Sequence, residues 1–439
     1  MNKNSKIYVA GGTGLVGSAI IKKLLEKGYK NVISTYRNRQ PLNDKVKWIK
    51  LDLLNQNDVE EFLKNEKPEY VFLAAAKVGG IIANNTYRAD FIYENLQIQN
   101  NVIYNAYKYE VKKLMFLGST CIYPKNCPQP IKEEYLLTGE LEYTNEPYAI
   151  AKIAGIKMCE SFNLQYGTNF ISVMPTNLYG ENDNFDLEKS HVLPALIRKI
   201  HLGKCLENGD WEGIRKDLNG TKVVIGNSLL VIGEKSSKED LLKVLNHFGI
   251  QYTNTPITNN QSTKPKVLIE IWGSGKPMRE FLYSDDMADA CVFLMENVDF
   301  KDIVDGYISN SYIGENKQIT NNQYTNIPIT NTHINIGTGK DISIKDLAYL
   351  IKDIIGFQGD FYFNTEKPDG TMRKVTDVSK LHSLGWQYKT TLKEGIEKVY
   401  RWYVEMSEQR VENNLPTTDY LLHAKIRKFM NGIRIYHDR

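Results

Sequence analysis

Tyr148 and Lys152 stand four residues apart in the segment YAIAK, and Ser119 lies 29 residues before the tyrosine. Because an α-helix repeats every ~3.6 residues, this spacing places the tyrosine and the lysine on one helical face. A lysine ammonium beside a phenol favours the phenolate and so lowers the pKa of the tyrosine. Tyr148 is therefore a candidate general acid for a carbonyl group that is being reduced. The pair alone is weak support, because tyrosine and lysine are common in this chain, so the elements around it must be considered.

A glycine-rich turn near the start of the chain is a candidate site for a dinucleotide. Gly11, Gly14 and Gly17 follow the apolar run 7–10, which predicts a buried strand, and apolar residues recur with helical period after the turn. These glycines let the backbone approach a pyrophosphate, which the helix N-terminus then stabilises. An ordinary glycine-rich loop is the alternative, but the position after the first strand favours dinucleotide binding. The GxxGxxG spacing is typical of short-chain dehydrogenases, and the predicted contacts include Thr13, Leu15 and Val16.

The end of the second predicted strand, at 31–37, indicates which dinucleotide to expect. NAD-binding proteins usually place a carboxylate here to accept a hydrogen bond from the ribose 2′-OH. This chain instead has Arg37, followed by Arg39. A cation where a 2′-phosphate would lie predicts NADP(H), although both arginines could equally be solvated surface residues.

Two further predicted strands complete the cofactor side of this site. The run at 46–51 leads into Asp52 and Leu53, which would hold the edge and the face of the adenine. The run at 70–76 ends in small residues, among them Ala75, which would let the cofactor pass close to the backbone.

Composition excludes several classes of protein. The 439 residues carry a formal net charge of only +3, which gives no field suited to nucleic acid or to a membrane surface. No apolar run approaches the ~18 residues of a membrane span, and the first residues lack a secretory signal pattern. The five cysteines show no metal-binding spacing, so we expect no metal site. A reduced, cytoplasmic setting is the expected location.

Longer stretches around these residues match one family of enzymes. They read LGSTCIYP at 117–124, NEPYAIAKIAG at 145–155, MPTNLYG at 174–180, WGSGKPMREF at 272–281 and KPDGT at 367–371. On these motifs the chain resembles the GDP-L-fucose synthases, NADPH-dependent epimerase-reductases of the extended short-chain dehydrogenase group. The resemblance covers about residues 5–205 and 267–405.

The resemblance implies a GDP-linked 4-keto-6-deoxy sugar as the substrate. A ketone at C4 acidifies the protons at C3 and C5, so epimerisation needs a base on one face and an acid on the other. Cys121 resembles the family's base and His191 its acid, although a thiol is a fair base only if neighbours lower its pKa. Reduction at C4 would follow, with Tyr148 protonating the oxygen, Ser119 hydrogen-bonding it, and Lys152 holding the nicotinamide ribose. A buried structural cysteine and a helix-capping histidine are the alternatives.

Further contacts are implied by the same resemblance. Asn177 would contact the sugar, the flat face of Trp272 would stack on guanine, and the forked guanidinium of Arg279 would meet diphosphate oxygens. Lys199 and Lys367 would add cations for the nucleotide sugar. The remaining implied cofactor contacts are Pro175, Asn177, Leu178 and His191. Simple packing or surface charge is the alternative for each of the substrate residues.

Two features depart from the family pattern. Thr13 stands where these synthases carry an arginine in the glycine turn, so NADP preference would rest on Arg37 and Arg39. The second is a long insertion at 207–266, which contains predicted strands at 223–225 and 229–232 and a predicted helix at 238–245. Polar tracts at 253–263 and 319–326 predict surface loops.

Strands alternating with helices predict a Rossmann-type, doubly wound parallel sheet with a smaller C-terminal substrate lobe and an inserted segment. The predicted NADP-binding domain spans 1–180, with later pieces near 282–300 and 333–339. The substrate lobe spans mainly 181–407, and 408–439 is a C-terminal extension. The resemblance also implies a homodimer.

Three functions are compatible with the sequence. The first is synthesis of GDP-L-fucose. The second is 4-reduction, with or without epimerisation, of another GDP-4-keto-6-deoxy sugar such as a heptose. The third is a non-catalytic NADP-sensing regulator, against which intact Ser119, Tyr148 and Lys152 argue.

Overall fold

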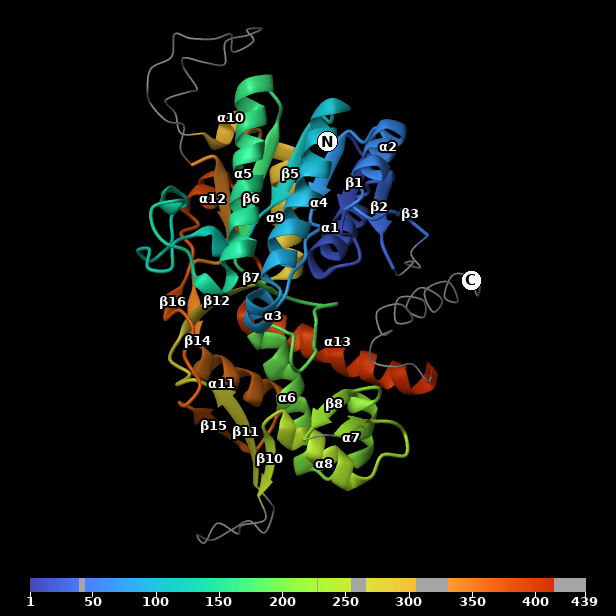
Figure 1. The fold of residues 1–439 in the computed structure, drawn as a ribbon, viewed down its shortest axis with the longest axis vertical. Coiled ribbons are helices and arrows are strands. Elements are labelled where there is room, and N and C mark those ends of the chain that lie inside the picture. Colours follow the sequence, from blue (N-terminus) through green and yellow to red (C-terminus); the bar gives the residue numbers. More distant parts are fainter. Residues whose placement is uncertain (39–43, 227, 254–265, 305–330, 414–439) are drawn as a thin grey trace. The chain divides into compact units, whose positions relative to one another are not determined.

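The computed structural model describes residues 1–38, 44–226, 228–253, 266–304 and 331–413 (Figure 1). Arg39, almost all of the polar tract at 253–263, the whole of that at 319–326 and most of the C-terminal extension lie outside these residues. The chain forms two compact units. The first comprises residues 1–182, 280–341 and 374–390, and the second comprises 183–279, 342–373 and 391–439.

The first unit contains a seven-stranded sheet in the order β13-β6-β5-β4-β1-β2-β3. Every neighbouring pair in it is parallel, so the predicted doubly wound parallel sheet is confirmed. The return of the strand near residue 333 to this sheet is also confirmed. The strands are β1 (Ile7–Ala10), β2 (Val32–Tyr36), β3 (Lys47–Lys50), β4 (Tyr70–Leu73), β5 (Lys113–Leu117), β6 (Phe170–Pro175) and β13 (His333–Ile336).

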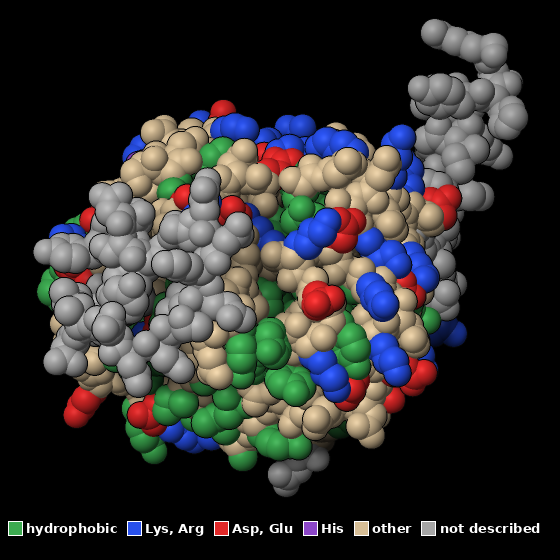
Figure 2. Space-filling view, turned by 90° about the horizontal axis from the view of Figure 1, so that it is seen from above, with side chains coloured by type: hydrophobic (Ala, Val, Ile, Leu, Met, Phe, Trp, Pro, Cys, Tyr) green, Lys and Arg blue, Asp and Glu red, His purple; other side chains and the backbone are tan. Residues whose placement is uncertain are grey.

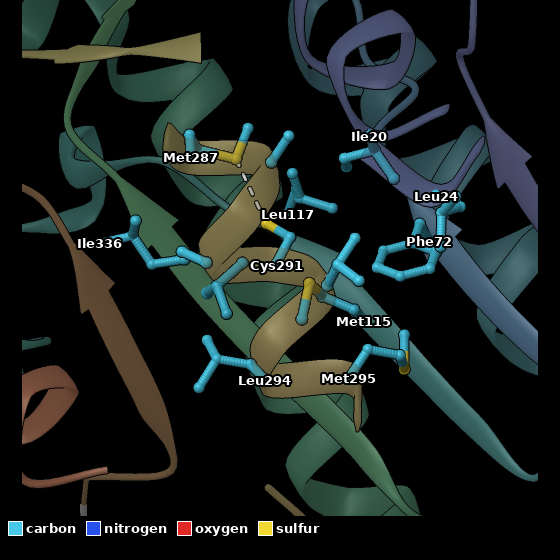
Figure 3. Close-up of a cluster of buried hydrophobic side chains, with 14 of the residues drawn as sticks. Ile20, Leu24, Phe72, Met115, Leu117, Met287, Cys291, Leu294, Met295 and Ile336 are labelled. Carbon is cyan, nitrogen blue, oxygen red and sulfur yellow. Dashed lines mark hydrogen bonds between the residues drawn. The ribbon is translucent and has the colours of Figure 1, made fainter. Parts of the chain in front are cut away.

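Helices cover both faces of this sheet because successive strand residues point to opposite sides. On one face, Met115 and Leu117 of β5 belong to a core with α1 (Leu15–Glu26) and α9 (Ser284–Asn297). Figure 3 shows Met287, Cys291 and Leu294 of α9 within this core. On the other face, Leu114 and Phe116 of β5 pack with α2 (Gln56–Glu66), α4 (Arg88–Lys108) and α5 (Glu146–Tyr166).

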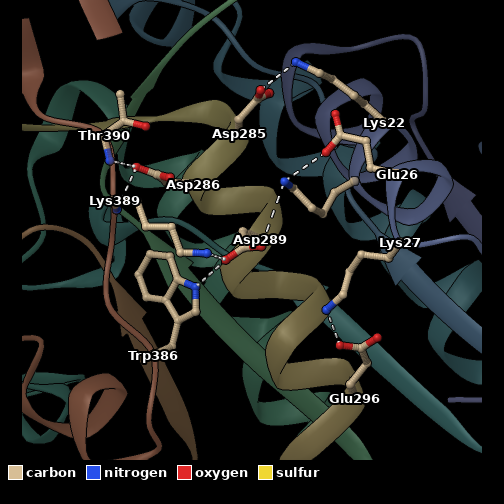
Figure 4. Close-up of polar contacts among 11 residues, drawn as sticks. Lys22, Glu26, Lys27, Asp285, Asp286, Asp289, Glu296, Trp386, Lys389 and Thr390 are labelled. Atoms are coloured by element: carbon tan, nitrogen blue, oxygen red, sulfur yellow. Dashed lines mark hydrogen bonds and ion pairs between the residues drawn. The ribbon is translucent and has the colours of Figure 1, made fainter. Parts of the chain in front are cut away.

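Polar contacts of α9 fix the last segment of the first unit (Figure 4). The buried Asp286 carboxylate accepts hydrogen bonds from the backbone N–H groups of Lys389, at 3.2 Å, and Thr390, at 2.7 Å. Trp386 Nε1 donates to Asp289 at 3.0 Å. Lys22 of α1 pairs with Asp285 at 2.6 Å. Helix α9 therefore bonds on one side to α1 and on the other to the segment at 386–390, both far from it in the sequence (Figure 4).

The second unit is built around α6 (Val192–Glu207), α11 (Ile344–Ile355), α13 (Leu392–Asn413) and a sheet in the order β10-β11-β15. These strands are β10 (Ile250–Thr253), β11 (Lys266–Trp272) and β15 (Asp360–Asn364). The predicted strands and helix of the insertion are present as β8 (Lys222–Ile225), β9 (Ser228–Val231) and α8 (Lys238–His247). The insertion also contains α7 (Trp211–Leu218) and β10, which the sequence patterns did not predict.

Shorter elements complete the described chain. They are α3 (Ile81–Thr86), η1 (Thr120–Ile122), η2 (Glu133–Tyr135), η3 (Tyr143–Asn145), β7 (Asn177–Tyr179), β12 (Met278–Tyr283), α10 (Phe300–Ile303), β14 (Asp341–Ser343), β16 (Arg373–Lys374) and α12 (Ser379–Ser383). No helix among the described residues combines the length and the apolar character needed to cross a bilayer. On the face drawn in Figure 2, acidic and basic side chains are interspersed, in keeping with the balanced composition.

Candidate active site

The carboxyl ends of five neighbouring strands bring most of the candidate residues of the first unit to one edge of the sheet. The strands β1, β2, β4, β5 and β6 run parallel and end at Ala10, Tyr36, Leu73, Leu117 and Pro175. The glycine turn, Arg37, Ala75, Ser119 and Asn177 all follow these ends closely. Ligands of open parallel sheets bind beyond this edge. The arrangement therefore gathers the candidate cofactor and catalytic residues in one region.

At two positions of the glycine turn a side chain would collide with the backbone. A Cβ on Gly11, whose φ is +83°, would lie 2.8 Å from the Ala75 backbone, and one on Gly17 would lie 2.2 Å from the Gly11 carbonyl oxygen. Gly14 caps the N-terminus of α1, with no acidic residue in the first helical turn, and its N–H donates to the Gly11 oxygen at 3.1 Å. The exposed turn thus leaves a positive helix end uncovered, which suits a diphosphate.

A pocket beside β2 and β3 offers two cations. It has a volume of about 520 Å³ and is lined by Arg37, Asn38, Lys50, Leu51, Asp52 and Asp58. Lys50 lies there because Tyr36 and Lys50 pair in register across the two strands. The sequence analysis missed Lys50, since its pairing with the second strand is not a local pattern. The carboxylates of Asp52 and Asp58 line the same pocket, so two cations and two anions face it.

Buried amides on α4 hold three backbone segments that border this region. Asn95 binds the backbone of Lys77 twice, accepting from its N–H at 2.9 Å and donating to its oxygen at 3.0 Å. Asn101 donates to the Leu53 oxygen at 2.8 Å, and Gln99 donates to the Ala151 oxygen at 2.7 Å. All three side chains are almost fully buried. In the sequence, these amides stand out only as polar residues among the apolar positions of a helix. The sequence analysis did not use that pattern.

Lys152 lies beneath Tyr148 on α5, as the four-residue spacing predicts. Its Nζ atom donates to the Leu117 oxygen at 2.8 Å and lies 5.7 Å from the centre of the Tyr148 ring. Phe91 of α4 meets the same ring edge-on, with the ring centres 6.4 Å apart. The phenol is therefore held between a lysine and an aromatic side chain at the end of β5.

The expectation that Lys152 lowers the pKa of Tyr148 is wrong for this structure. Burial raises the pKa of Tyr148 well above its usual value, and the charge of Cys121 raises it further. Burial also lowers the pKa of Lys152 to about 8, with a small opposing effect from Cys121. Desolvation is the largest cause of both shifts. The outcome keeps Tyr148 protonated at neutral pH, which is the state that a proton donor requires.

Ser119 and Cys121 are joined through a short 3₁₀ turn. Ser119 caps η1, and its Oγ accepts a hydrogen bond from the Cys121 N–H at 3.4 Å. Cys121 is buried, and burial raises the pKa of its thiol. The positive charge of Lys374 opposes this effect most strongly, followed by the Ser119 hydrogen bond and the charge of Lys152. Lys374 was missed by the sequence analysis.

The side chain of Asn177 hydrogen-bonds to another segment of the first unit. Its side-chain amide donates to the Glu280 backbone oxygen at 2.8 Å, which joins β7 to β12 next to the end of β6. Pro175 is the last residue of β6, and Leu178 is half-buried in β7.

The second unit carries the other candidate substrate residues. His191 is exposed at the N-cap position of α6 but makes no capping hydrogen bond with its side chain, so it is not a capping histidine. Lys199 lies on the same helix, and burial lowers its pKa, against the opposing charge of Glu270. His191 therefore precedes the first turn of α6, and Lys199 lies in the middle of the same helix.

Trp272 and Lys367 form a cation–aromatic pair in the second unit. Trp272 ends β11 with 57% of its surface exposed, and Lys367 Nζ lies 5.3 Å from its ring centre. Their two loops are joined where Asp369 accepts from Ser274 N, at 2.8 Å, and Ser274 Oγ, at 2.7 Å. Arg279 donates to the Thr371 oxygen at 2.5 Å. An exposed aromatic face with cations beside it can bind a nucleotide base and its diphosphate.

Among the described residues no group of histidine, cysteine and carboxylate side chains could hold a metal ion. The five cysteines are free thiols.

The sequence of this chain is similar to those of known enzymes. The profile of the NAD dependent epimerase/dehydratase family matches residues 7–216 and 215–307. GDP-L-fucose synthase 1 of Arabidopsis thaliana is 44% identical over 405 residues, which cover 92% of this chain and 94% of that protein.

Two solved structures from Campylobacter jejuni are also similar, and each comparison covers 92% of this chain and 99% of the other. A GDP-6-OMe-4-keto-L-xylo-heptose reductase has 45% identity and a TM-score of 0.75. MlghC, a GDP-mannoheptose C4 reductase with NADP bound, has 44% identity and a TM-score of 0.71.

Proposed function

The chain belongs to the NAD dependent epimerase/dehydratase family, and from this premise we propose that it converts GDP-4-keto-6-deoxy-D-mannose to GDP-L-fucose with NADPH. The proposed reaction comprises epimerisation at C3 and C5 and reduction at C4. The observation that carries the proposal is the cluster of Ser119, Cys121, Tyr148 and Lys152 at the end of β5. A carbonyl-reducing set of side chains and a thiol therefore lie together at the end of β5, and they supply groups for both activities.

The residues of the first unit fit the cofactor. The glycine turn and the N-terminus of α1 would hold the diphosphate, and Arg37 with Lys50 would hold a 2′-phosphate. Asp52 and Leu53 would border the adenine, and Ala75 leaves the backbone open to close approach. When bound, NADPH supplies the hydride for the reduction.

The catalytic side chains have separate tasks in this proposal. Cys121 takes a proton from C3 or C5, and His191 returns one to the other face of the sugar. Tyr148 donates its phenolic proton to the C4 oxygen while Ser119 hydrogen-bonds that oxygen. Lys152, held by the Leu117 oxygen, stabilises the phenolate that remains. Trp272, Arg279, Lys199 and Lys367 bind the nucleotide sugar from the second unit.

A second candidate function is reduction of a GDP-linked keto-heptose. The similarity of this chain to heptose reductases of C. jejuni is as high as its similarity to the A. thaliana synthase. Retention of both Cys121 and His191 supports epimerisation as part of the reaction, which favours the first candidate.

The experiment that separates these candidates uses the purified protein with NADPH and GDP-4-keto-6-deoxy-D-mannose in deuterium oxide. NMR of the products should show GDP-L-fucose carrying deuterium at C3 and C5. Reduction without deuterium incorporation would contradict the epimerase activity. Absence of turnover with this sugar, together with turnover of a GDP-keto-heptose, would instead establish the second candidate.

We also propose that the protein is a cytoplasmic homodimer that pairs through α4 and α5. Both helices expose large hydrophobic side chains, namely Tyr93, Tyr104, Ile150 and Tyr166. Sedimentation equilibrium of the wild-type protein should give twice the 50.3 kDa mass of the chain, and a monomer would contradict this proposal.

Replacing Arg37 by alanine should weaken the preference for NADPH over NADH. Loss of one phosphate contact should raise the KM for NADPH about 10- to 100-fold, because a charge-assisted hydrogen bond contributes ~1.5–3 kcal/mol. The KM for NADH should change less than twofold. Lys30→Ala, which removes an exposed cation outside the pocket, is the matched control. Equal effects on both cofactors would contradict the assignment of Arg37 to the 2′-phosphate.

The rate of reduction should fall as the pH rises above about 8. Burial lowers the pKa of Lys152 to about 8, so its ammonium is lost above that value and no longer stabilises the Tyr148 phenolate. The free energy of unfolding should meanwhile increase as the pH rises from about 8 to the normal lysine pKa. In that range Lys152 binds its proton only in the unfolded chain. Single-turnover NADPH oxidation from pH 6 to 9.5 should therefore show a decline without unfolding. A constant rate across this range would contradict the role of Lys152.

A further inference from the structure

We propose that Tyr123 is a positioning residue, whose phenol holds the turn η1, and with it Ser119 and Cys121, against strand β13 at the edge of the sheet. The inference rests on the proposed function, since it concerns two side chains that carry the proposed activities. It assigns a task to a buried tyrosine that the proposed mechanism does not use.

The turn η1 places Ser119 and Cys121 within one hydrogen-bonded stretch of backbone. Ser119 Oγ accepts from the Cys121 N–H at 3.4 Å, and Tyr123 is the C-cap residue of the turn. Just before the turn, the Gly118 N–H donates to the Val173 oxygen of β6 at 2.8 Å. The start of the turn is therefore fixed by β6, and its end depends on what holds Tyr123.

The phenol of Tyr123 contacts two side chains of β13. Its hydroxyl donates to Asn335 Oδ1 at 2.6 Å and lies 2.9 Å from His333 Nε2. His333 and Asn335 are two residues apart, so they point to the same face of the strand. Tyr123, His333 and Asn335 are only 4%, 1% and 0% exposed, so water cannot replace these contacts.

The side chain of Asn335 determines which atom donates in each of these hydrogen bonds. Its Nδ2 atom donates to the backbone oxygens of Ile131, at 3.0 Å, and Asp377, at 3.3 Å, so its Oδ1 atom faces the phenol. The one hydroxyl proton of Tyr123 is thus given to Asn335, and His333 Nε2 must donate to the phenol oxygen. Replacing Tyr123 by phenylalanine therefore removes two buried hydrogen bonds at once.

The same assignment makes His333 a neutral imidazole. Its other nitrogen, Nδ1, is buried and has no hydrogen-bond partner among the described residues, so a second proton there would be unpaired. Burial lowers the pKa of His333 to about 3, and the charges of Lys380 and Lys157 lower it further. Burial also raises the pKa of the Tyr123 phenol well above its ordinary value. Neither group changes its charge near neutral pH, so both hydrogen bonds persist there.

Strand β13 is a firm support for the phenol. It pairs in parallel with β6, where His333 lies opposite Ser172 and Asn335 opposite Met174. The Asn335 N–H also donates to Glu133 Oε1 at 3.0 Å. Since β6 binds Gly118 directly and β13 binds Tyr123, both ends of the turn are held by neighbouring strands of one sheet.

The test compares Tyr123→Phe with Tyr8→Phe, which makes the same change at another buried tyrosine. Tyr8 lies on β1, and its hydroxyl is 3.0 Å from Thr35 Oγ1. Two rates are measured with GDP-4-keto-6-deoxy-D-mannose, namely deuterium exchange at C3 and C5 and single-turnover reduction by NADPH. Tyr123→Phe should lower both rates about 10- to 100-fold, because a small displacement of catalytic groups has an effect of this order.

The Michaelis constants separate positioning from a general loss of structure. Tyr123→Phe should change the KM for NADPH and for the sugar less than about threefold, so that the loss appears in kcat. Tyr8→Phe also loses a buried hydrogen bond, and it should lower the free energy of unfolding by ~0.5–1.5 kcal/mol. Its two rates should nevertheless stay within about twofold of the wild-type values.

Equal rates in folded Tyr123→Phe and Tyr8→Phe would overturn the inference. A fall in only one of the two activities would also overturn it, because Ser119 and Cys121 share the turn. If Tyr123→Phe fails to fold, His333→Leu is compared with His333→Gln, which keeps an N–H donor for the phenol. The leucine variant should then be about three- to tenfold slower in both activities, and equal rates would refute the role of the phenol. Absence of both activities in the wild-type protein would instead refute the proposed function itself.

Discussion

Tyr148→Phe should lower the rate of NADPH-dependent ketone reduction by about 10²- to 10⁴-fold, the range that a positioned general acid contributes. The substitution removes only the phenolic oxygen and leaves the ring that packs against Phe91 and over Lys152. The affinity for NADPH should therefore change less than about twofold. Single-turnover absorbance measurements give the rate, and quenching of protein fluorescence gives the affinity.

The epimerase half-reaction separates this prediction from a general loss of structure. Tyr148→Phe leaves Cys121 in place, so deuterium exchange at C3 and C5 of the keto sugar should continue. Tyr143→Phe is the matched control, because it makes the same chemical change at a tyrosine that is 67% exposed. Reduction at the wild-type rate in Tyr148→Phe would remove the proposed acid. Loss of exchange and reduction together would show that the ring oxygen organises the whole pocket.

Local patterns in the sequence were sufficient to predict the sheet and the edge at which the candidate site residues gather. The apolar run at 7–10 gave β1 with its observed bounds, because four buried residues followed by a glycine turn leave few alternatives. Tyr148 and Lys152 came together because helical spacing is set by backbone geometry alone. The fold of the first unit and the placing of its candidate pair Tyr148 and Lys152 were thus determined by short-range features.

The residues that the sequence analysis missed depend on contacts between distant segments. Lys50 reaches the Arg37 pocket through strand pairing, and Lys374, whose charge opposes the effect of burial on the pKa of the Cys121 thiol, comes from a segment far along the chain. The error in the direction of the Tyr148 pKa has a related cause. Attraction to Lys152 follows from spacing, but the larger effect of burial depends on how the whole unit packs around the phenol.

Asp217→Ala should destabilise the second unit by about 3–5 kcal/mol, because it leaves the buried guanidinium of Arg198 without its counter-charge. Asp217 lies on α7, within the insertion, and its Oδ1 atom accepts from Arg198 Nε at 2.8 Å. Its other carboxylate oxygen accepts from the hydroxyl of Tyr403 on α13. The Arg198 and Asp217 side chains are only 8% and 1% exposed. Urea unfolding, followed by circular dichroism, measures the change in the free energy of unfolding.

Two variants test the cause of this loss. Glu212→Ala removes a carboxylate from the same helix that is 62% exposed and pairs with Arg215, so it should cost less than about 0.5 kcal/mol. Arg198→Leu combined with Asp217→Leu should recover part of the stability, since a buried pair replaced as a whole leaves no unpaired charge. A loss below about 1 kcal/mol in Asp217→Ala would contradict the buried pair.

The same result bears on the insertion at 207–266. A separable ornament could be removed without loss of folding, but this insertion supplies the carboxylate that two other helices of the second unit use. We therefore expect a chain with residues 207–266 replaced by a short bridge to be insoluble as it stands. Adding Arg198→Leu and Tyr403→Phe to that deletion should restore part of its solubility. Full solubility of the simple deletion would show that α7 is dispensable for the core of the second unit.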